Sequence, residues 1–459
     1  MGFFTFCNTW IFAPVLPVLL LGAGIYLAVL MRGYPLRAPK TVLRVFKRKS
    51  EGGVSPFRAV TLALAGTLGV GNIAGVASAI AAGGPGAVFW MWISALCAMM
   101  VKYAEILLAV RYRKAENGVW HGGAMYYMTG RILPAVFAAI CVAASFPLGN
   151  VIQIKAAAES LESVSGLSGL SVGLICAVLV LIVVGGGVHK ISDLTVRLIP
   201  ALSGLYIAMS AFILIRFASH LPGAFGAILE GAFSFRAAAG GGLGYIILSF
   251  LRSGSLRYGV TRGIMSNEAG CGTAPMAHAA AKTDSPAQQG CWGVFEVFCD
   301  TILLCTLTAL VILVTGVPVS DAGSGMDLAV AAFAAGLGPV AGYLLCGSAF
   351  LFAFATVICW AYYGLECLHF LTCKPVFRIA YIILYALSSV YGSVAAPGAA
   401  WIFADFAVGV MTVLNTVCVC LHGGELQTET FRLFGAGTPR EKVSADSVVS
   451  VRTACPKRN

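Results

Sequence analysis

The sequence has few charged residues for its length. Only 11% of its 459 residues are charged, 59% are hydrophobic, and the mean hydropathy is +0.89. Soluble domains carry roughly 25% charged residues, so this composition excludes an ordinary soluble domain. A membrane-spanning helix needs roughly 20 mainly apolar residues, and such runs fill most of the chain up to about Leu421. We expect a transmembrane domain over 1–424 and a cytoplasmic tail over 425–459 that is polar, aperiodic and disordered.

The sequence also lacks the residue clusters of an enzyme or an ATP-driven pump. We find no nucleophile paired with a base, no metal-ligating cluster at one membrane depth, and no G-x-x-x-x-G-K-[ST] pattern. The cysteines lie mostly in apolar runs, where small, buried and reduced side chains are the expected reading. No catalytic residue and no organic cofactor is predicted. The net charge of +11 is explained by membrane topology, so no nucleic-acid partner is inferred, and no obligatory protein partner either.

The apolar runs predict an all-α membrane protein of about eleven transmembrane helices. An extra N-terminal helix at 10–31 precedes a core over 55–422. The remaining candidate spans are 59–82, 87–110, 134–158, 170–187, 195–216, 244–281, 290–316, 340–370, 376–394 and 399–422.

Basic residues predict the orientation of these spans, because Lys and Arg near helix ends stay on the cytoplasmic side. The segment 32–58 is the richest in Lys and Arg, so we place it inside and the N-terminus outside. The other strongly basic loops then fall on the same side, and the C-terminus is cytoplasmic. We expect a multi-pass protein of the bacterial inner membrane.

Two spans are interrupted by glycine and polar residues, one at 66–75 and the other at 266–275. Freed backbone groups are costly in hydrocarbon unless they line a cavity or are buried in protein. Half-helix ends offer N–H groups to a carboxylate and carbonyl oxygens to a sodium ion. Glycines also permit close helix packing, which is the alternative reading of either break alone. The two breaks together, with Asn72, Asn267 and Glu268 at membrane depth, favour a binding site.

Several long motifs resemble the alanine-or-glycine:cation symporter family. They are Gly66 to Ile80, Gly83 to Trp92, Gly122 to Tyr127, Arg262 to Ala281, Gln288 to Gly290, Glu296 to Thr301, and Phe352 to Gly364. The resemblance implies a leucine-transporter (LeuT) type of fold, a 5+5 inverted repeat whose first and sixth core helices are broken. It also implies sodium-coupled symport of alanine, glycine or a similar small neutral amino acid into the cell by alternating access, with Na⁺ as coupling ion and no other metal.

The resemblance implies a set of site residues as well. Those expected to meet the substrate are Gly69, Gly71, Asn72, Gln153, Asn267, Gly270, Gly272, Thr356 and Trp360. Sodium is expected at the Asn72 side chain, and at a second site made by the Ala65 and Leu68 carbonyls with the Thr356 hydroxyl. Thr356 and Trp360 lie four residues apart on one helical face, which places both at the same cavity. Packing of the Trp360 ring and an interhelical bond of Gln153 are the structural alternatives.

Lys155 departs from the family pattern, which usually has asparagine there. A lysine at this position could replace a coupling cation, or it could pair with Glu159 one turn later and reach the interface. A proton-coupled transporter of the same fold therefore remains an alternative, as does an amino-acid sensor that does not transport. Arg262 and Asp405 are expected to form an outer gate, and Glu268 is a further coupling candidate.

Overall fold

A computed structural model describes most of the chain. The described residues are 2–37, 42, 54–116, 118–233, 254–283, 285–318, 325–396 and 398–435. Three predicted features lie partly outside them, namely the basic segment 32–58, the 244–281 stretch and the 425–459 tail.

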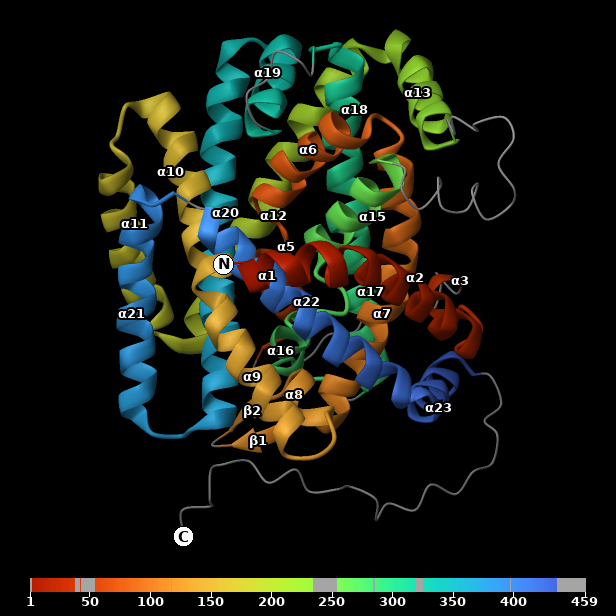
Figure 1. Ribbon diagram of the computed structural model, residues 1–459, viewed down its shortest axis with the longest axis vertical. Coiled ribbons are helices and arrows are strands. Elements are labelled where there is room, and N and C mark those ends of the chain that lie inside the picture. Colours follow the sequence, from red (N-terminus) through yellow and green to blue (C-terminus); the bar gives the residue numbers. More distant parts are fainter. Residues whose placement is uncertain are drawn as a thin grey trace.

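The described chain is helical apart from one small hairpin (Figure 1). The N-terminal half contains α1 (Gly2–Phe6), η1 (Cys7–Phe12), α2 (Ala13–Leu30), α3 (Tyr34–Arg37), α5 (Pro56–Thr67), η2 (Val70–Asn72), α6 (Ala74–Gly83), α7 (Ala87–Tyr112), β1 (Lys114–Glu116), β2 (Val119–His121), α8 (Ala124–Tyr127), α9 (Ile132–Ser145), η3 (Pro147–Val151), α10 (Ile152–Ser165), α11 (Gly169–Val184), α12 (Gly187–Arg216), η4 (Ala218–His220) and α13 (Leu221–Phe233). The C-terminal half contains α15 (Gly254–Asn267), α16 (Ala274–Ala279), α17 (Pro286–Val297), η5 (Phe298–Cys305), α18 (Thr306–Thr315), α19 (Gly325–Leu337), α20 (Pro339–Leu371), α21 (Pro375–Val394), α22 (Gly398–Leu421) and α23 (Gly423–Phe434).

The predicted spans correspond to helices of the structure. Within the described residues, eight helices are long and apolar enough to cross a membrane, and the pair α5 with η2–α6, bent by 66°, makes a ninth. The two other predicted spans match the shorter helix α11 and the pair α15–α16.

Local sequence explains where several helices begin. Ser55, Ser168 and Ser285 are N-cap residues whose hydroxyls accept a backbone N–H three residues later. Pro56 and Pro286 follow two of these caps at the first helical position, where a missing N–H costs nothing. Short polar segments therefore start helices that are otherwise apolar.

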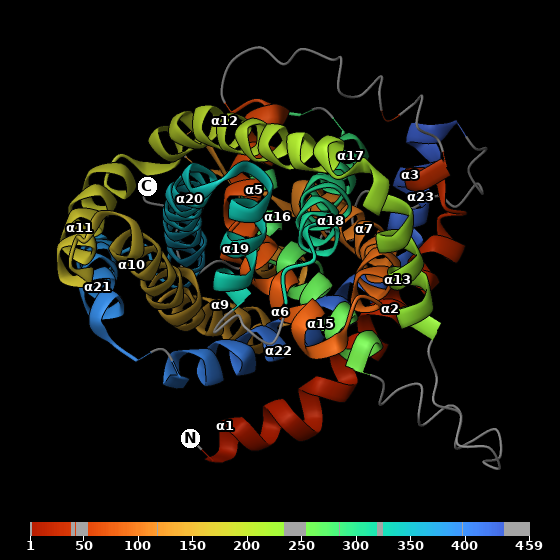
Figure 2. The ribbon, with the colours of Figure 1, turned by 90° about the horizontal axis from the view of Figure 1, so that it is seen from above.

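The long helices pack against one another and against the broken ones. Helix α7 packs against α15 and α17, while α11 packs against α21 and α10 against α20. Figures 1 and 2 show α10, α11 and α21 standing together at one side of the molecule. Some crossings admit no side chain at all, because a Cβ on Gly86 would overlap the backbone of Gly231 and one on Gly259 would overlap that of Ala87. Glycine permits these close approaches.

The segment after the last span differs from the prediction. Residues of the expected disordered tail form α23, which buries Leu426 and Phe431 and bonds Arg111 of α7 through Glu425 and Glu429. The apolar residues of α23 are few within a polar stretch, so the sequence was interpreted as aperiodic and the helix was missed. Of the predicted tail, the residues beyond 435 lie outside the described part.

The hairpin β1–β2 lies between α7 and α8 and contacts the end of α20. Its strands are antiparallel, with Ala115 opposite Trp120. His121 Nδ1 lies 2.9 Å from Glu366 Oε2, and His369 Nε2 lies 3.1 Å from Glu116 Oε2. The two imidazole rings stack with centroids 4.3 Å apart. The hairpin is thus attached to α20 by two histidine–carboxylate pairs.

Candidate functional site

The first break separates α5 from α6. Helix α5 ends at Thr67, and Leu68 and Gly69 have non-helical backbone before the short turn η2. The Gly69 N–H donates to Asn72 Oδ1 at 3.2 Å, so this side chain satisfies a backbone donor that the break has freed. The predicted interruption of the second span is confirmed.

The second break separates α15 from α16. Three residues there have positive φ, namely Glu268 at 50°, Gly270 at 79° and Gly272 at 80°. Glycine adopts this conformation without penalty, but a glutamate does so at a cost of order 1–3 kcal/mol. The Gly270 carbonyl accepts a bond from Asn415 Nδ2 at 2.9 Å, which anchors the unwound backbone to α22.

Both breaks open into one cavity of about 320 Å³. Five predicted substrate residues line it, namely Gly69, Gly71, Gln153, Thr356 and Trp360. A Cβ on Gly69 would lie 3.0 Å from Thr356 Oγ1 and 3.4 Å from Gln153 Oε1, so both side chains face the unwound turn. Gln153 Oε1 is buried without a hydrogen-bond partner among the described residues. Such an atom is available to a ligand.

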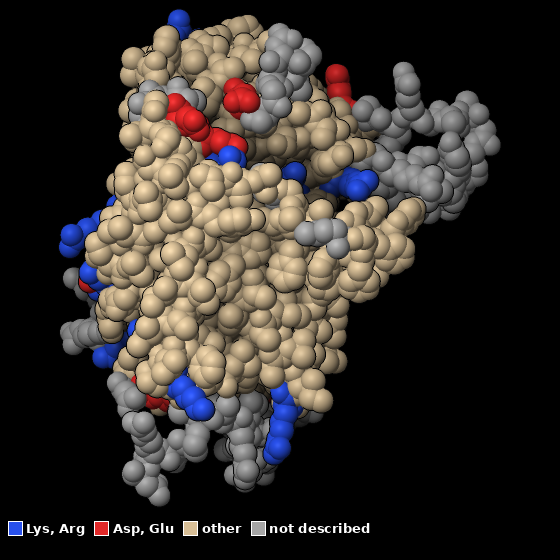
Figure 3. Space-filling model, turned by 60° about the vertical axis from the view of Figure 1, so that its left-hand side comes forward, with Lys and Arg blue, Asp and Glu red and all other residues tan. Residues whose placement is uncertain are grey.

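The charged candidates lie in the same cavity wall. It includes Lys155, Glu159, Arg262, Asp405 and Glu268. Lys155 Nζ lies 3.5 Å from Glu159 Oε1. The structure thus contains the pairing with Glu159 that the sequence offered as an alternative to a role in ion coupling. Figure 3 shows acidic and basic side chains around a hollow in the upper part of the molecule, above a broad surface of uncharged residues.

The other predicted residues lie behind the cavity wall. The Asn267 side chain accepts from Ala269 N–H and donates to Thr301 Oγ1, and a side chain on Gly272 would meet Ala124 and Asn415. Those outside the lining are Ala65, Leu68, Asn72, Asn267, Gly270 and Gly272.

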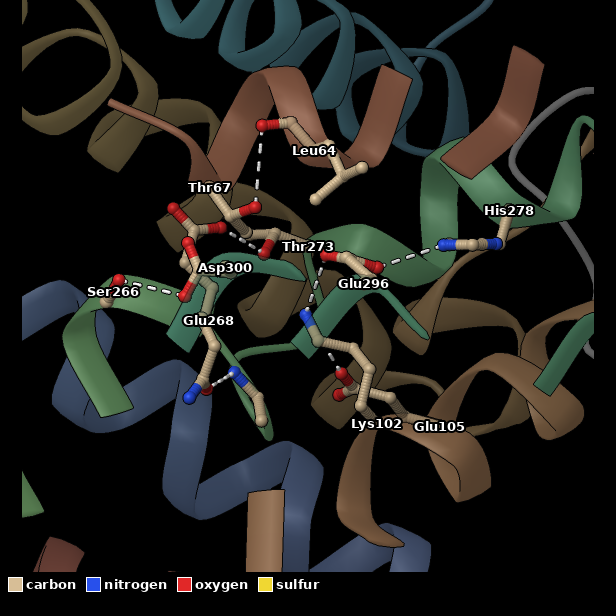
Figure 4. Close-up of polar contacts among 12 residues, drawn as sticks. Leu64, Thr67, Lys102, Glu105, Ser266, Glu268, Thr273, His278, Glu296 and Asp300 are labelled. Atoms are coloured by element: carbon tan, nitrogen blue, oxygen red, sulfur yellow. Dashed lines mark hydrogen bonds and ion pairs between the residues drawn. The ribbon is translucent and has the colours of Figure 1, made fainter. Parts of the chain in front are cut away.

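Asp300 was not predicted as a site residue, yet it joins the two breaks. Its carboxylate accepts bonds from Asn72 Nδ2 at 2.7 Å, Ser266 Oγ at 2.8 Å and Thr301 Oγ1 at 2.7 Å. Asn72 belongs to the first break and Ser266 lies in the last turn of α15, before the second break, whereas Asp300 lies in the π-helix η5. Figure 4 shows Ser266 directed at Asp300. π-Helical segments are frequent at functional sites.

A buried ionic cluster lies close to the second break (Figure 4). Lys102 Nζ is 3.4 Å from Glu296 and 3.8 Å from Glu105, and all three side chains are almost completely buried. Glu296 also contacts His278 Nε2 at 3.0 Å, which links α17 to α16. A buried carboxylate needs a partner, and Lys102 is the partner of both Glu105 and Glu296.

Comparison with known proteins decides the family. The model of the sodium:alanine symporter family matches residues 2–433. The chain belongs to this family. Sodium/alanine symporter AgcS of Methanococcus maripaludis is 36% identical, with 92% of this chain and 95% of the relative covered. The probable sodium/glutamine symporter GlnT of Bacillus subtilis is 33% identical over 96% of this chain and 91% of its own. As a member of the sodium:alanine symporter family, the protein is a membrane transporter and not an enzyme.

Solved structures show the fold. MhsT in complex with L-phenylalanine superposes with a TM-score of 0.58 at 15% identity, covering 85% of this chain and 94% of that one. A Na⁺-coupled sialic acid symporter in a substrate-bound outward-open state gives 0.52 at 12% identity, covering 90% and 85%. The leucine-transporter type of fold expected from the sequence is therefore confirmed.

Proposed function

We propose that the protein carries alanine, glycine or a similar small neutral amino acid into the cell together with Na⁺. One observation carries the proposal: the cavity brings the unwound Gly69–Gly71 turn, Gln153, Thr356 and Trp360 together. This turn lies at the N-terminus of the half-helix α6, where backbone N–H groups are available to the substrate carboxylate. Gln153 Oε1 offers an acceptor, and the large Trp360 ring limits the room for a side chain.

Sodium is assigned to neutral oxygens near the first break. Thr356 Oγ1 faces Gly69, close to where α5 ends and its last carbonyl groups are free of helical bonds. A Na⁺ there would hold α20 against the broken helix, which couples ion binding to the closure of the cavity. Transport by alternating access then moves substrate and ion together across the bacterial inner membrane, with the N-terminus outside and the C-terminus in the cytoplasm.

The names of relatives support an amino-acid cargo without fixing its identity. AgcS is named for alanine and GlnT for glutamine, so the size of the substrate side chain is the property to be measured.

The test is uptake of radiolabelled alanine by proteoliposomes that contain the purified protein. We expect an inward sodium gradient to drive accumulation, and Thr356→Val to lower the apparent affinity for sodium. Lack of alanine and glycine uptake by folded protein under any gradient would refute the substrate assignment.

Lys155 provides the test of ion choice. Its pairing with Glu159 favours a structural role, so Lys155→Asn should leave sodium dependence intact. Accumulation that follows a proton gradient, and becomes sodium-dependent in Lys155→Asn, would instead support proton coupling. Amino-acid binding without uptake would support a sensor.

A further inference from the structure

Trp360 is held on several sides within the cavity wall. It is only 1% exposed, and its Cβ lies so close to Gly149 of η3 that a side chain there would collide with it. Its ring meets Tyr363 edge-on, with centroids 5.7 Å apart. These contacts restrict the position of the side chain on α20.

The polar end of the Trp360 ring is fixed by Glu268. The indole Nε1–H donates to Glu268 Oε1 at 3.2 Å, and Glu268 Oε2 accepts from Thr273 Oγ1 at 2.7 Å. Both carboxylate oxygens therefore have a partner. The hydrogen bond between Trp360 and Glu268 joins α20 to the second break, and both residues line the cavity.

The backbone of Glu268 also indicates a specific role. It is one of two non-glycine residues with positive φ in the described chain, and it lies between the two halves of a broken helix. Strained conformations of this kind persist where the surrounding structure requires them and cluster at ligand clamps. From this position the carboxylate reaches Trp360 of α20.

We propose that Glu268 is a positioning residue that fixes Trp360 as the steric limit on the substrate side chain. The inference rests on the proposed function and deepens it. A substrate with a short side chain leaves the ring in place. A longer one displaces the ring and breaks a hydrogen bond that lies away from bulk water, where such a bond is strong. Selection for alanine over glutamine follows from this difference.

The test compares uptake of alanine and glutamine, each measured as KM and kcat, in Glu268→Gln and Glu268→Met. Both replacements are unbranched at Cβ, so both face the same backbone strain. Glutamine keeps an oxygen that accepts from the indole N–H, whereas methionine removes the acceptor. We expect Glu268→Gln to keep the selectivity close to that of the wild type, and Glu268→Met to raise the glutamine-to-alanine ratio of kcat/KM about tenfold, chiefly through KM.

Trp360→Phe supplies the second arm, because it keeps a ring but removes the donor. If the hydrogen bond carries the effect, Glu268→Met should change selectivity far less in the Trp360→Phe background. Should Glu268→Met fail to fold, Thr273→Val removes the other bond that orients the carboxylate and should shift selectivity in the same direction.

Equal changes of selectivity in Glu268→Gln and Glu268→Met would overturn the inference, as would additive effects of Glu268→Met and Trp360→Phe on selectivity. Alanine uptake by the wild type would still support the proposed function in either case. If neither uptake nor thermal stabilisation by amino acids occurs in the wild type, the proposed function falls and this inference falls with it.

Discussion

At the scale of single residues, Gly149 shows how closely the cavity wall is packed. A methyl group there would overlap Trp360 Cβ, so Gly149→Ala should destabilise the protein by about 1–3 kcal/mol and reduce uptake. Thermal unfolding of the purified protein in detergent measures the first effect. Gly347→Ala is the matched control, since Gly347 lies in α20 with no other group within 4 Å of a Cβ. Equal melting temperatures for the two variants would contradict the prediction.

Residues of the cavity were predictable where a motif marks them. Gly69, Gly71, Thr356 and Trp360 fall in stretches that resemble the family, and Gln153 is a further residue that the resemblance implies. The structure brings all five into one cavity. Asp300 and Asn415 were missed as site residues, although each is a polar residue within an apolar run. Such a residue signals that a partner exists, but the partner is set by helix packing and lies far away in the sequence.

At the scale of elements, Asp300 ties η5 to both breaks. Asp300→Ala would remove the carboxylate that accepts from Asn72, Ser266 and Thr301, and we expect a loss of at least about 2 kcal/mol of stability. Asp300→Asn keeps an oxygen for Asn72 and a group that bonds hydroxyls, so its loss should be less than about half as large. Unfolding in detergent compares them. A larger loss in the asparagine variant would contradict the assigned bonds.

The hairpin provides a pH-dependent contact. Burial disfavours a charged His121, but the hydrogen bond and charge of Glu366 outweigh burial, with Glu116 adding to them, and the pKa of His121 is raised above its usual 6.5. The protonated form therefore prefers the folded state. The contribution to stability is fully present below the ordinary pKa and is lost as pH rises through the raised one.

We accordingly expect amide exchange in β2, corrected for the intrinsic effect of pH, to accelerate as pH increases from about 6 to 9. His121→Gln should remove most of this dependence. An unchanged pH profile in that variant would assign the effect to another group.

Elements were predictable from the sequence to different degrees. Long apolar runs place the spans, since period and length are visible in the residues themselves. The π-helices η1, η3 and η5 were not predicted, because a single added residue in a turn leaves no mark in composition. Helix α23 was missed because its apolar positions are few and widely spaced within a polar segment.

At the scale of the whole molecule, the Lys102 cluster connects three helices. Lys102→Met would leave Glu105 and Glu296 buried with their shared cation gone, although His278 remains beside Glu296. We expect a loss of about 3–5 kcal/mol, measured by thermal or denaturant unfolding. Lys374→Met, on an exposed lysine, is the control and should change stability by about 0.5 kcal/mol or less. Similar stability of the two variants would mean that the cluster contributes little.

The glycine crossings have a consequence for how such a transporter can diverge. Where Gly86 meets Gly231, any side chain forces two helices apart, whatever the cargo. Lineages that change their cargo therefore have few options at these crossings. Substitutions that change the substrate should therefore occur among the side chains that line the cavity, while the glycines at the helix crossings stay unchanged.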